Sequence, residues 1–121
     1  MDIVLNQNSD EPIYSQIFQQ ISNQILSGKI LGGTQLPTIR LIAQELKISV
    51  IPVKRAWEEL DRSGLIKTIT GKGTFVSELN QSKLKEIKSS NAENFVKQIC
   101  LQAKENGITQ DELIKLIKKF Y

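Results

Sequence analysis

The stretch from Leu36 to Val76 constrains the fold more than any other part of the chain. Apolar residues recur at helical spacing from Ile39 to Leu46 and again from Val50 to Leu60. Only a few residues separate the two runs, so we expect two short helices joined by a tight turn. Two β-type runs then flank the glycine-rich residues 70–73, which predicts a hairpin.

Residue types at the predicted helix ends support this order of elements. Thr38 is a suitable N-cap for the first helix, and Pro37 prevents an earlier helix from running into it. Ser49 is the expected N-cap of the second helix. Pro52 is tolerated in its first turn, because N–H groups there have no partner within the helix. Gly64 is expected to end this second helix.

Charge is sorted along the second predicted helix. Its buried stripe is expected to consist of Val53, Ala56, Trp57 and Leu60, which leaves Val50, Ile51, Lys54 and Arg55 on the outward side. The acidic residues come later, at positions 58, 59 and 61, where they would lie away from a phosphate backbone. This arrangement favours a winged helix-turn-helix, whose second helix enters the DNA major groove. On charge alone, a merely solvated face is the alternative.

The chain resembles the GntR-type bacterial transcription regulators. The resemblance rests on Pro12-Ile13-Tyr14 with Gln16-Ile17, the Gly28 to Gly33 turn, Leu36-Pro37-Thr38-Ile39-Arg40 and Gly71-Lys72-Gly73-Thr74-Phe75-Val76. Ser49-Val50-Ile51 and Lys54-Arg55-Ala56, with a short tail, are most similar to the YtrA-like branch. The resemblance implies a mainly α-helical fold with a small β-hairpin: a winged helix-turn-helix domain over residues 1–78 and a two-helix dimerisation tail over residues 79–121.

Carried over position by position, the resemblance implies a DNA-binding surface shared by both helices and the hairpin tip. Its members are Thr38, Arg40, Ser49, Val50, Ile51, Pro52, Lys54, Arg55, Thr70, Gly71, Lys72 and Gly73. Arg40 matches the family's phosphate- or base-contacting arginine. Many relatives have arginine in place of Val50 and threonine in place of Pro52. Base readout is therefore expected to rest on apolar contacts with thymine methyl groups, together with Lys54 and Arg55.

The tail carries an apolar stripe that two helices of this size cannot bury alone. A break is expected at Gly107, followed by a capping box at residues 109–112. Residues 89–91 are a weak point at which a helix could bend or restart. The predicted dimerisation residues are Leu84, Ile87, Phe95, Ile99, Leu113, Leu116, Ile117 and Phe120. The expected partner is the same tail of a second copy. The alternative is that the tail folds back on its own winged domain.

The residues before the central stretch are expected to support it. Residues 9–12 have the composition of a helix start, with capping side chains, acids and a proline in the first turn. The core helix that follows is expected to end at Gly28, and residues 1–8 are expected to pack as an extended arm. Core packing is the expected role of Tyr14, with a phosphate contact as the alternative.

Composition narrows the classes of function. The chain has 121 residues and a net charge of +3, but residues 1–80 contain eight Lys/Arg and eight Asp/Glu. DNA binding by this part of the chain would therefore depend on where the basic residues lie and not on net charge. Histidine is absent and Cys100 is the one cysteine, so neither a metal site, a cofactor nor an intrachain disulfide is expected. The absence of a leader-like or membrane-spanning segment favours a cytoplasmic location.

Four functional readings are compared on these grounds. A sequence-specific DNA-binding regulator is the leading one, by resemblance a homodimeric repressor of a palindromic operator. A winged-helix protein-interaction module without sequence-specific DNA binding is the alternative. An enzyme is disfavoured because no catalytic cluster is evident, and RNA binding because no aromatic stacking surface is. Whether a small-molecule effector binds is left open.

Overall fold

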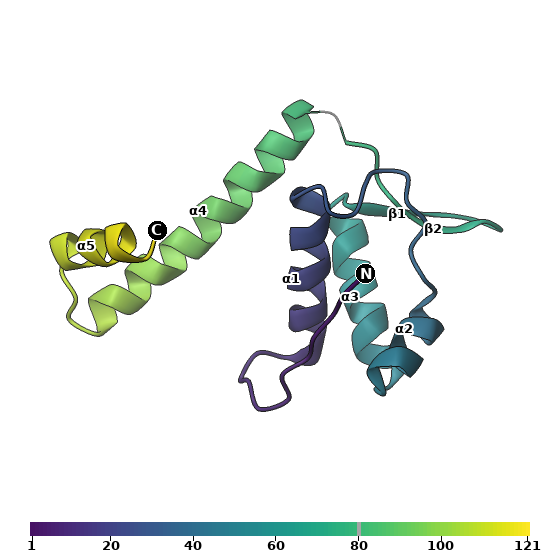
Figure 1. The fold of residues 1–121 in the computed structure, drawn as a ribbon, viewed down its shortest axis with the longest axis horizontal. Coiled ribbons are helices and arrows are strands. Elements are labelled where there is room, and N and C mark those ends of the chain that lie inside the picture. The colour runs from purple at the N-terminus through teal and green to yellow at the C-terminus, as the bar shows by residue number, and fades with distance from the viewer. Residues whose placement is uncertain (80) are drawn as a thin grey trace. The chain divides into compact units, whose positions relative to one another are not determined.

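Residues 1–79 and 81–121 are described by the computed structural model of the chain. Within them the chain forms five helices and one two-stranded antiparallel hairpin, in two compact units, Met1–Asn80 and Gln81–Tyr121 (Figure 1). In chain order the elements are α1 (Ile13–Leu26), α2 (Ile39–Leu46), α3 (Val50–Arg62), β1 (Ile66–Ile69), β2 (Gly73–Val76), α4 (Gln81–Glu105) and α5 (Gln110–Phe120). The predicted fold class, mainly helical with a small hairpin, is confirmed.

The core of the first unit forms where α1 and α2 pack against α3, and where α3 packs against β1. Figure 1 shows α1 and α3 side by side. The largest fully buried side chains come from α1, α3 and the hairpin region: Ile17, Ile21, Leu60, Leu65, Val53 and Val76. Burying an aliphatic side chain of this size contributes about 1.5–3 kcal/mol. This shared core therefore holds α3 in a fixed orientation.

The start of α1 differs from the prediction. The helix begins at Ile13, with Pro12 in the N-cap position and no side chain capping it. Ser9 does not cap the helix. Its hydroxyl oxygen accepts a hydrogen bond from the backbone N–H of Glu11 at 3.1 Å, which forms a local turn before the helix. Short polar side chains commonly make such local turns in competition with helix capping.

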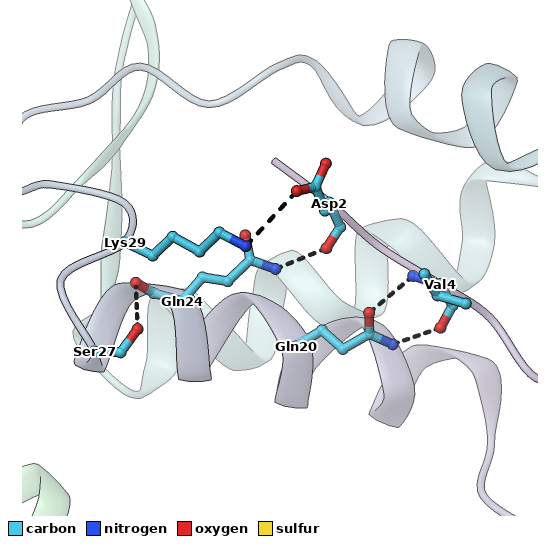
Figure 2. Close-up of polar contacts among 6 residues, drawn as sticks. All are labelled: Asp2, Val4, Gln20, Gln24, Ser27 and Lys29. Carbon is cyan, nitrogen blue, oxygen red and sulfur yellow. Dashed lines mark hydrogen bonds and ion pairs between the residues drawn. The ribbon is translucent and has the colours of Figure 1, made fainter.

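An N-terminal arm, residues 1–8, is held along α1 by side-chain amides. Gln20 makes two hydrogen bonds with Val4, accepting from its N–H at 2.8 Å and donating to its carbonyl at 2.7 Å (Figure 2). Gln24 donates to the carbonyl of Asp2 at 2.7 Å (Figure 2). Four helical residues advance about 6 Å and two extended residues about 6.7 Å, so every fourth helix position meets every second arm residue.

Gln16 is the buried member of this series. Its amide oxygen accepts from the N–H of Asn6 at 2.8 Å, and its amide nitrogen donates to the carbonyls of Asn6 at 3.0 Å and Glu11 at 2.9 Å. Its side chain is buried in the core region, whereas a glutamine in a helix is normally exposed. These three bonds satisfy the polar groups that burial would otherwise leave unpaired.

The second unit consists of α4 and α5. The helix α4 runs through residues 89–91 without interruption, so the helix does not restart there. Serine and asparagine each cost only a few tenths of a kcal/mol in a helix, which is too little to break one with good helix formers on both sides. After α4, Gly107 adopts a φ of 73° and the N–H of Ile108 donates to the carbonyl of Ala103 at 2.8 Å. Thr109 then caps α5 by accepting from the N–H of Glu112 at 3.2 Å.

The buried amide of Gln16 yields a stability prediction. We expect Gln16→Ala to lower the free energy of unfolding by about 1–3 kcal/mol, because the arm loses its partner and polar groups are left unsatisfied. Urea unfolding followed by Trp57 fluorescence measures this change. Gln19→Ala, at an exposed position of the same helix, is the matched control and should change stability by less than about 0.5 kcal/mol. Equal effects of the two substitutions would contradict the role assigned to Gln16.

Candidate nucleic-acid interface

The two short helices are joined by a tight turn, residues 47–49. Lys47 adopts the left-handed conformation, with a φ of 57° and a ψ of 46°. The N–H of Ile48 donates to the carbonyl of Ala43 at 3.0 Å, which satisfies one of the last carbonyls of α2. A left-handed residue in this place is usually glycine. The turn thus aims α3 away from α2, which is the geometry of a helix-turn-helix.

The outward side of α3 combines apolar and basic residues near its N-terminus. Ile51 is 74% exposed and Val50 is 46% exposed, although both are large apolar side chains. Lys54 is exposed beside them, whereas Pro52 is half-buried. The opposite stripe of the helix is buried, as predicted, through Val53, Ala56, Trp57 and Leu60. The predicted N-cap Ser49 takes the extended conformation of an N-cap, without a side-chain capping bond.

The helix α2 contributes a second basic group. Thr38 caps this helix through its hydroxyl oxygen, which accepts from the N–H of Leu41 at 3.1 Å. The cap places Arg40 in the first turn, where it is exposed. In the part of the chain that the structure describes, no carboxylate pairs with Arg40, Lys54 or Lys72. Their charges are therefore available to an anionic ligand.

The hairpin carries Lys72 at its tip. Ile66 pairs with Val76 and Ile69 with Gly73, and Thr70 to Lys72 form the connection. The N–H of Lys72 donates to the carbonyl of Ile69 at 2.9 Å, which closes the turn. Gly71 and Gly73 have φ values of 79° and 124°, a region that side chains other than glycine adopt with strain. Residues that tolerate a positive φ are thus needed on both sides of the exposed lysine, and glycine adopts such values without strain.

A third strand-like segment, residues 33–36, supports the hairpin and was not anticipated from the sequence. Gly33 and Leu36 donate to the carbonyls of Val76 and Thr74, both at 2.8 Å. Gln35 lies opposite Phe75, and its side-chain amide donates to the carbonyl of Lys72 at 3.0 Å. Gln35 therefore braces the tip of the hairpin. Sequence separation conceals this contact, since no local pattern links residue 35 to residue 72.

Arg55 has a contact that sequence reasoning also missed. Its guanidinium carbon lies 3.6 Å from the centre of the Tyr14 ring, so the two side chains stack. Tyr14 lies in the first turn of α1 and is half-buried, while Arg55 is exposed. The ring was expected to pack in the core. Instead it joins α1 to the charged side of α3.

The structure places all the predicted DNA-binding residues in the first unit, on α2, the turn, α3 and the hairpin tip. Among the described residues no group of His, Cys, Asp and Glu side chains could hold a metal ion. None of the described helices has the length and apolar character to cross a membrane. The chemistry available at the surface is hydrogen-bond donation and positive charge, with apolar side chains between.

Residues 13–76 match the family described as "Bacterial regulatory proteins, gntR family". The chain belongs to the GntR family. The match begins at the first residue of α1 and ends at the last residue of β2, so it covers the helix-turn-helix and the hairpin together. The resemblance stated from the sequence is thereby confirmed, and the hairpin is the wing of a winged helix-turn-helix.

Relatives extend the GntR likeness into the tail. The chain is 33% identical over 117 residues to the HTH-type transcriptional repressor YtrA of Bacillus subtilis (strain 168), which spans 97% of this chain and 90% of that protein. A GntR family transcriptional regulator from Listeria monocytogenes aligns with a TM-score of 0.76 at 25% identity, covering 93% of this chain and 97% of that one. The DNA-binding domain of AraR in complex with operator ORX1 aligns with a TM-score of 0.55 at 29% identity, covering 64% and 96%.

The wing geometry leads to a second stability prediction. A Cβ added at Gly73 would lie 2.6 Å from the side-chain nitrogen of Gln35, whereas one at Gly71 would meet nothing within 4 Å. We expect Gly73→Ala to lower the free energy of unfolding by about 1–3 kcal/mol, through backbone strain and loss of the Gln35 brace. Gly71→Asn should cost less, because asparagine tolerates the left-handed conformation. Thermal unfolding of both variants decides this, and a larger loss for Gly71→Asn would contradict it.

Proposed function

We propose that this GntR-family chain is a homodimeric, sequence-specific DNA-binding repressor that binds a palindromic operator. The observation that carries the proposal is the outward side of α3, where Val50, Ile51 and Lys54 are exposed, in a unit whose wing ends in exposed Lys72. The relative YtrA is named a transcriptional repressor, and the AraR domain with a similar fold is bound to an operator. A protein bound to an operator would block transcription of the gene that the operator controls.

In this function, α3 lies in the major groove and reads bases. Lys54 can donate to O6 and N7 of guanine, which present two acceptors in the groove. Val50 and Ile51 can contact thymine methyl groups. Such contacts would explain why two large apolar side chains are exposed on α3. Apolar side chains also disfavour a misplaced polar base edge, because that edge would lose its hydrogen bonds to water.

Phosphate contacts position the domain on the duplex. Arg40 on α2 and Lys72 on the wing lie outside α3 and carry unpaired charges among the described residues. Such contacts fix register and orientation but do not distinguish sequences. The N-terminal end of α2 also favours an anion, because its first N–H groups point outward along the helix axis.

The groove assignment predicts the effect of removing two charges. We expect Lys54→Ala and Arg40→Ala each to weaken operator binding by about 1–3 kcal/mol or more, enough to remove the shifted band in a gel assay. The operator is first obtained by selection from random duplexes with the wild-type protein. Light scattering should show both variants unchanged in oligomeric state.

Lys97→Ala is the matched control, because Lys97 is an exposed lysine of α4 in the second unit. It should shift operator DNA as the wild-type protein does. Wild-type shifts by both Lys54→Ala and Arg40→Ala would show that α3 does not enter the groove. A DNA-independent protein partner captured at high salt would then favour the interaction-module alternative.

The dimer part of the proposal rests on the apolar surface of the second unit. Phe95 on α4 is 55% exposed, and Ile117 and Phe120 on α5 are 51% and 78% exposed. Other large apolar side chains of these helices are also exposed: Val96, Ile99, Leu101, Ile114 and Leu116. Soluble monomers rarely expose apolar residues in such number on adjoining helices. A second copy of the same surface would bury them, as a two-fold symmetric interface requires.

The predicted dimerisation residues differ in exposure. Phe95, Ile99, Leu116, Ile117 and Phe120 are exposed, whereas Leu84, Ile87 and Leu113 are half-buried. A dimer also suits the reading of DNA. Two α3 helices related by a two-fold axis would meet half-sites about 34 Å apart, one turn of the duplex.

Charge placed on this surface should separate the protomers. We expect Phe95→Glu and Ile117→Glu each to convert a dimer, twice the 13.7 kDa chain mass, into a monomer at micromolar concentration. Burying an unpaired carboxylate costs several kcal/mol, which is comparable to the stability of a modest interface. Lys118→Glu changes another exposed residue of α5 and should remain dimeric. Sedimentation equilibrium measures all three, and a monomeric wild-type protein would contradict the dimer.

A further inference from the structure

The stack between Tyr14 and Arg55 assigns these two residues different tasks on DNA. We propose that Tyr14 is a positioning residue that holds Arg55 at the flank of α3, where Arg55 binds a backbone phosphate and does not read a base. The inference rests on the proposed DNA-binding function and deepens it. Its starting point is the distance of 3.6 Å between the guanidinium carbon and the ring centre.

Helix geometry separates Arg55 from the other basic residue of α3. Consecutive residues project about 100° apart, so Lys54 and Arg55 cannot point in the same direction. Lys54 shares its strip with Val50, four residues earlier, and these two project together. Arg55 is drawn instead toward Tyr14, which belongs to α1, the helix packed against α3. Its guanidinium is therefore kept off the strip formed by Val50 and Lys54.

The stack leaves the chemistry of the guanidinium available. An arginine on an aromatic ring uses its flat face, while its N–H donors lie in the plane and point outward at the edge. Those donors match two oxygens of a phosphate. Glu59, four residues after Arg55, could have paired with it, but pairs with Arg62. Within the described residues no carboxylate competes for Arg55.

Preorganisation explains why an aromatic partner would matter. An arginine side chain loses rotational freedom when it grips a phosphate, and this loss opposes binding. A ring that restricts the side chain beforehand makes the loss at the moment of binding smaller. A phosphate contact of this kind would raise affinity for every duplex alike, because phosphates carry no sequence information.

A double-mutant cycle with the full chain tests the assignment. The probes are a duplex selected from a random pool by the wild-type protein and a duplex with the same bases in scrambled order. Fluorescence anisotropy is recorded at several KCl concentrations. We expect Arg55→Ala to weaken binding about tenfold on both probes and to reduce the salt slope by about one. Tyr14→Leu should weaken both about two- to fivefold.

The double variant separates positioning from independent contacts. Tyr14→Leu combined with Arg55→Ala should bind no more weakly than Arg55→Ala alone, because the ring acts only through the guanidinium. Additive losses would overturn the positioning role. A loss by Arg55→Ala on the selected duplex alone would overturn the phosphate assignment in favour of base reading.

Three further variants sharpen the reading. Tyr14→Phe keeps the ring and should rescue binding to within twofold of wild type; a loss as large as that of Tyr14→Leu would overturn the stack in favour of a hydroxyl contact. Arg55→Lys keeps the charge without the planar group, so it should weaken binding while retaining the salt slope. The affinity and salt slope of Arg55→Lys test the guanidinium contact even where Tyr14→Leu fails to fold. Arg62→Ala, a second arginine of α3, should match wild type.

Binding by the wild-type protein distinguishes a failure of the role given to Tyr14 from a failure of the proposed DNA-binding function. Binding of the selected duplex together with an additive cycle would overturn the role of Tyr14 and leave the DNA-binding function intact. A wild-type protein that binds neither duplex at low salt would overturn the proposed function and this inference with it.

Discussion

The packing of α3 against α1 determines which side chains of this chain can meet a ligand. Four residues of α3, at positions 53, 56, 57 and 60, are buried, and Ile17 and Ile21 of α1 are fully covered. Because an α-helix is rigid, burying one stripe fixes the direction of every other position on it. Val50, Ile51 and Lys54 point outward as a consequence of this packing. A rotation of α3 about its axis would move all of them together.

Backbone pairing couples the wing to the helix-turn-helix. Residues 33–36 pair with β2, and Leu36 at the end of this segment is buried in the core. The chain then passes through Pro37 to the cap of α2 at Thr38. Gln35 holds the tip of the wing at the carbonyl of Lys72. One short segment therefore sets the wing and the start of α2 at once, so Lys72 and Arg40 keep a defined relation within the first unit.

Local chemistry made the central elements predictable from the sequence. The helices α2 and α3 depend on apolar spacing and on capping at Thr38, and the wing depends on its glycines. Contacts between residues far apart in the chain could not be predicted, because no local sequence pattern marks them. Gln16, Gln20 and Gln24 look like ordinary exposed helix residues, and only the folded arm shows what they bind. The stack of Tyr14 on Arg55 has no local signature either.

Two predictions about helix ends and helix continuity failed because alternative backbone conformations have similar free energies. The possible restart of the helix at residues 89–91 overestimated the cost of serine and asparagine in a long helix. The helix start expected at residues 9–12 overlooked a competing local turn of Ser9 with Glu11. In both places several backbone conformations differ by about 1 kcal/mol or less, and the neighbouring residues decide between them. Composition near a helix end is informative only when a single conformation clearly wins, as at Thr38.

The charge of the winged domain explains why the proposed function needs the tail. Residues 1–80 carry eight positive and eight negative side chains, so the winged domain as a whole exerts little net attraction on DNA. Affinity must then come from the few basic groups held on one side, and one half-site offers few such contacts. Joining two winged domains through their tails makes the second binding event intramolecular and raises affinity without new contacts. In the proposed dimer, a neutral reading domain would therefore depend on the second copy for DNA binding more than a strongly basic domain would.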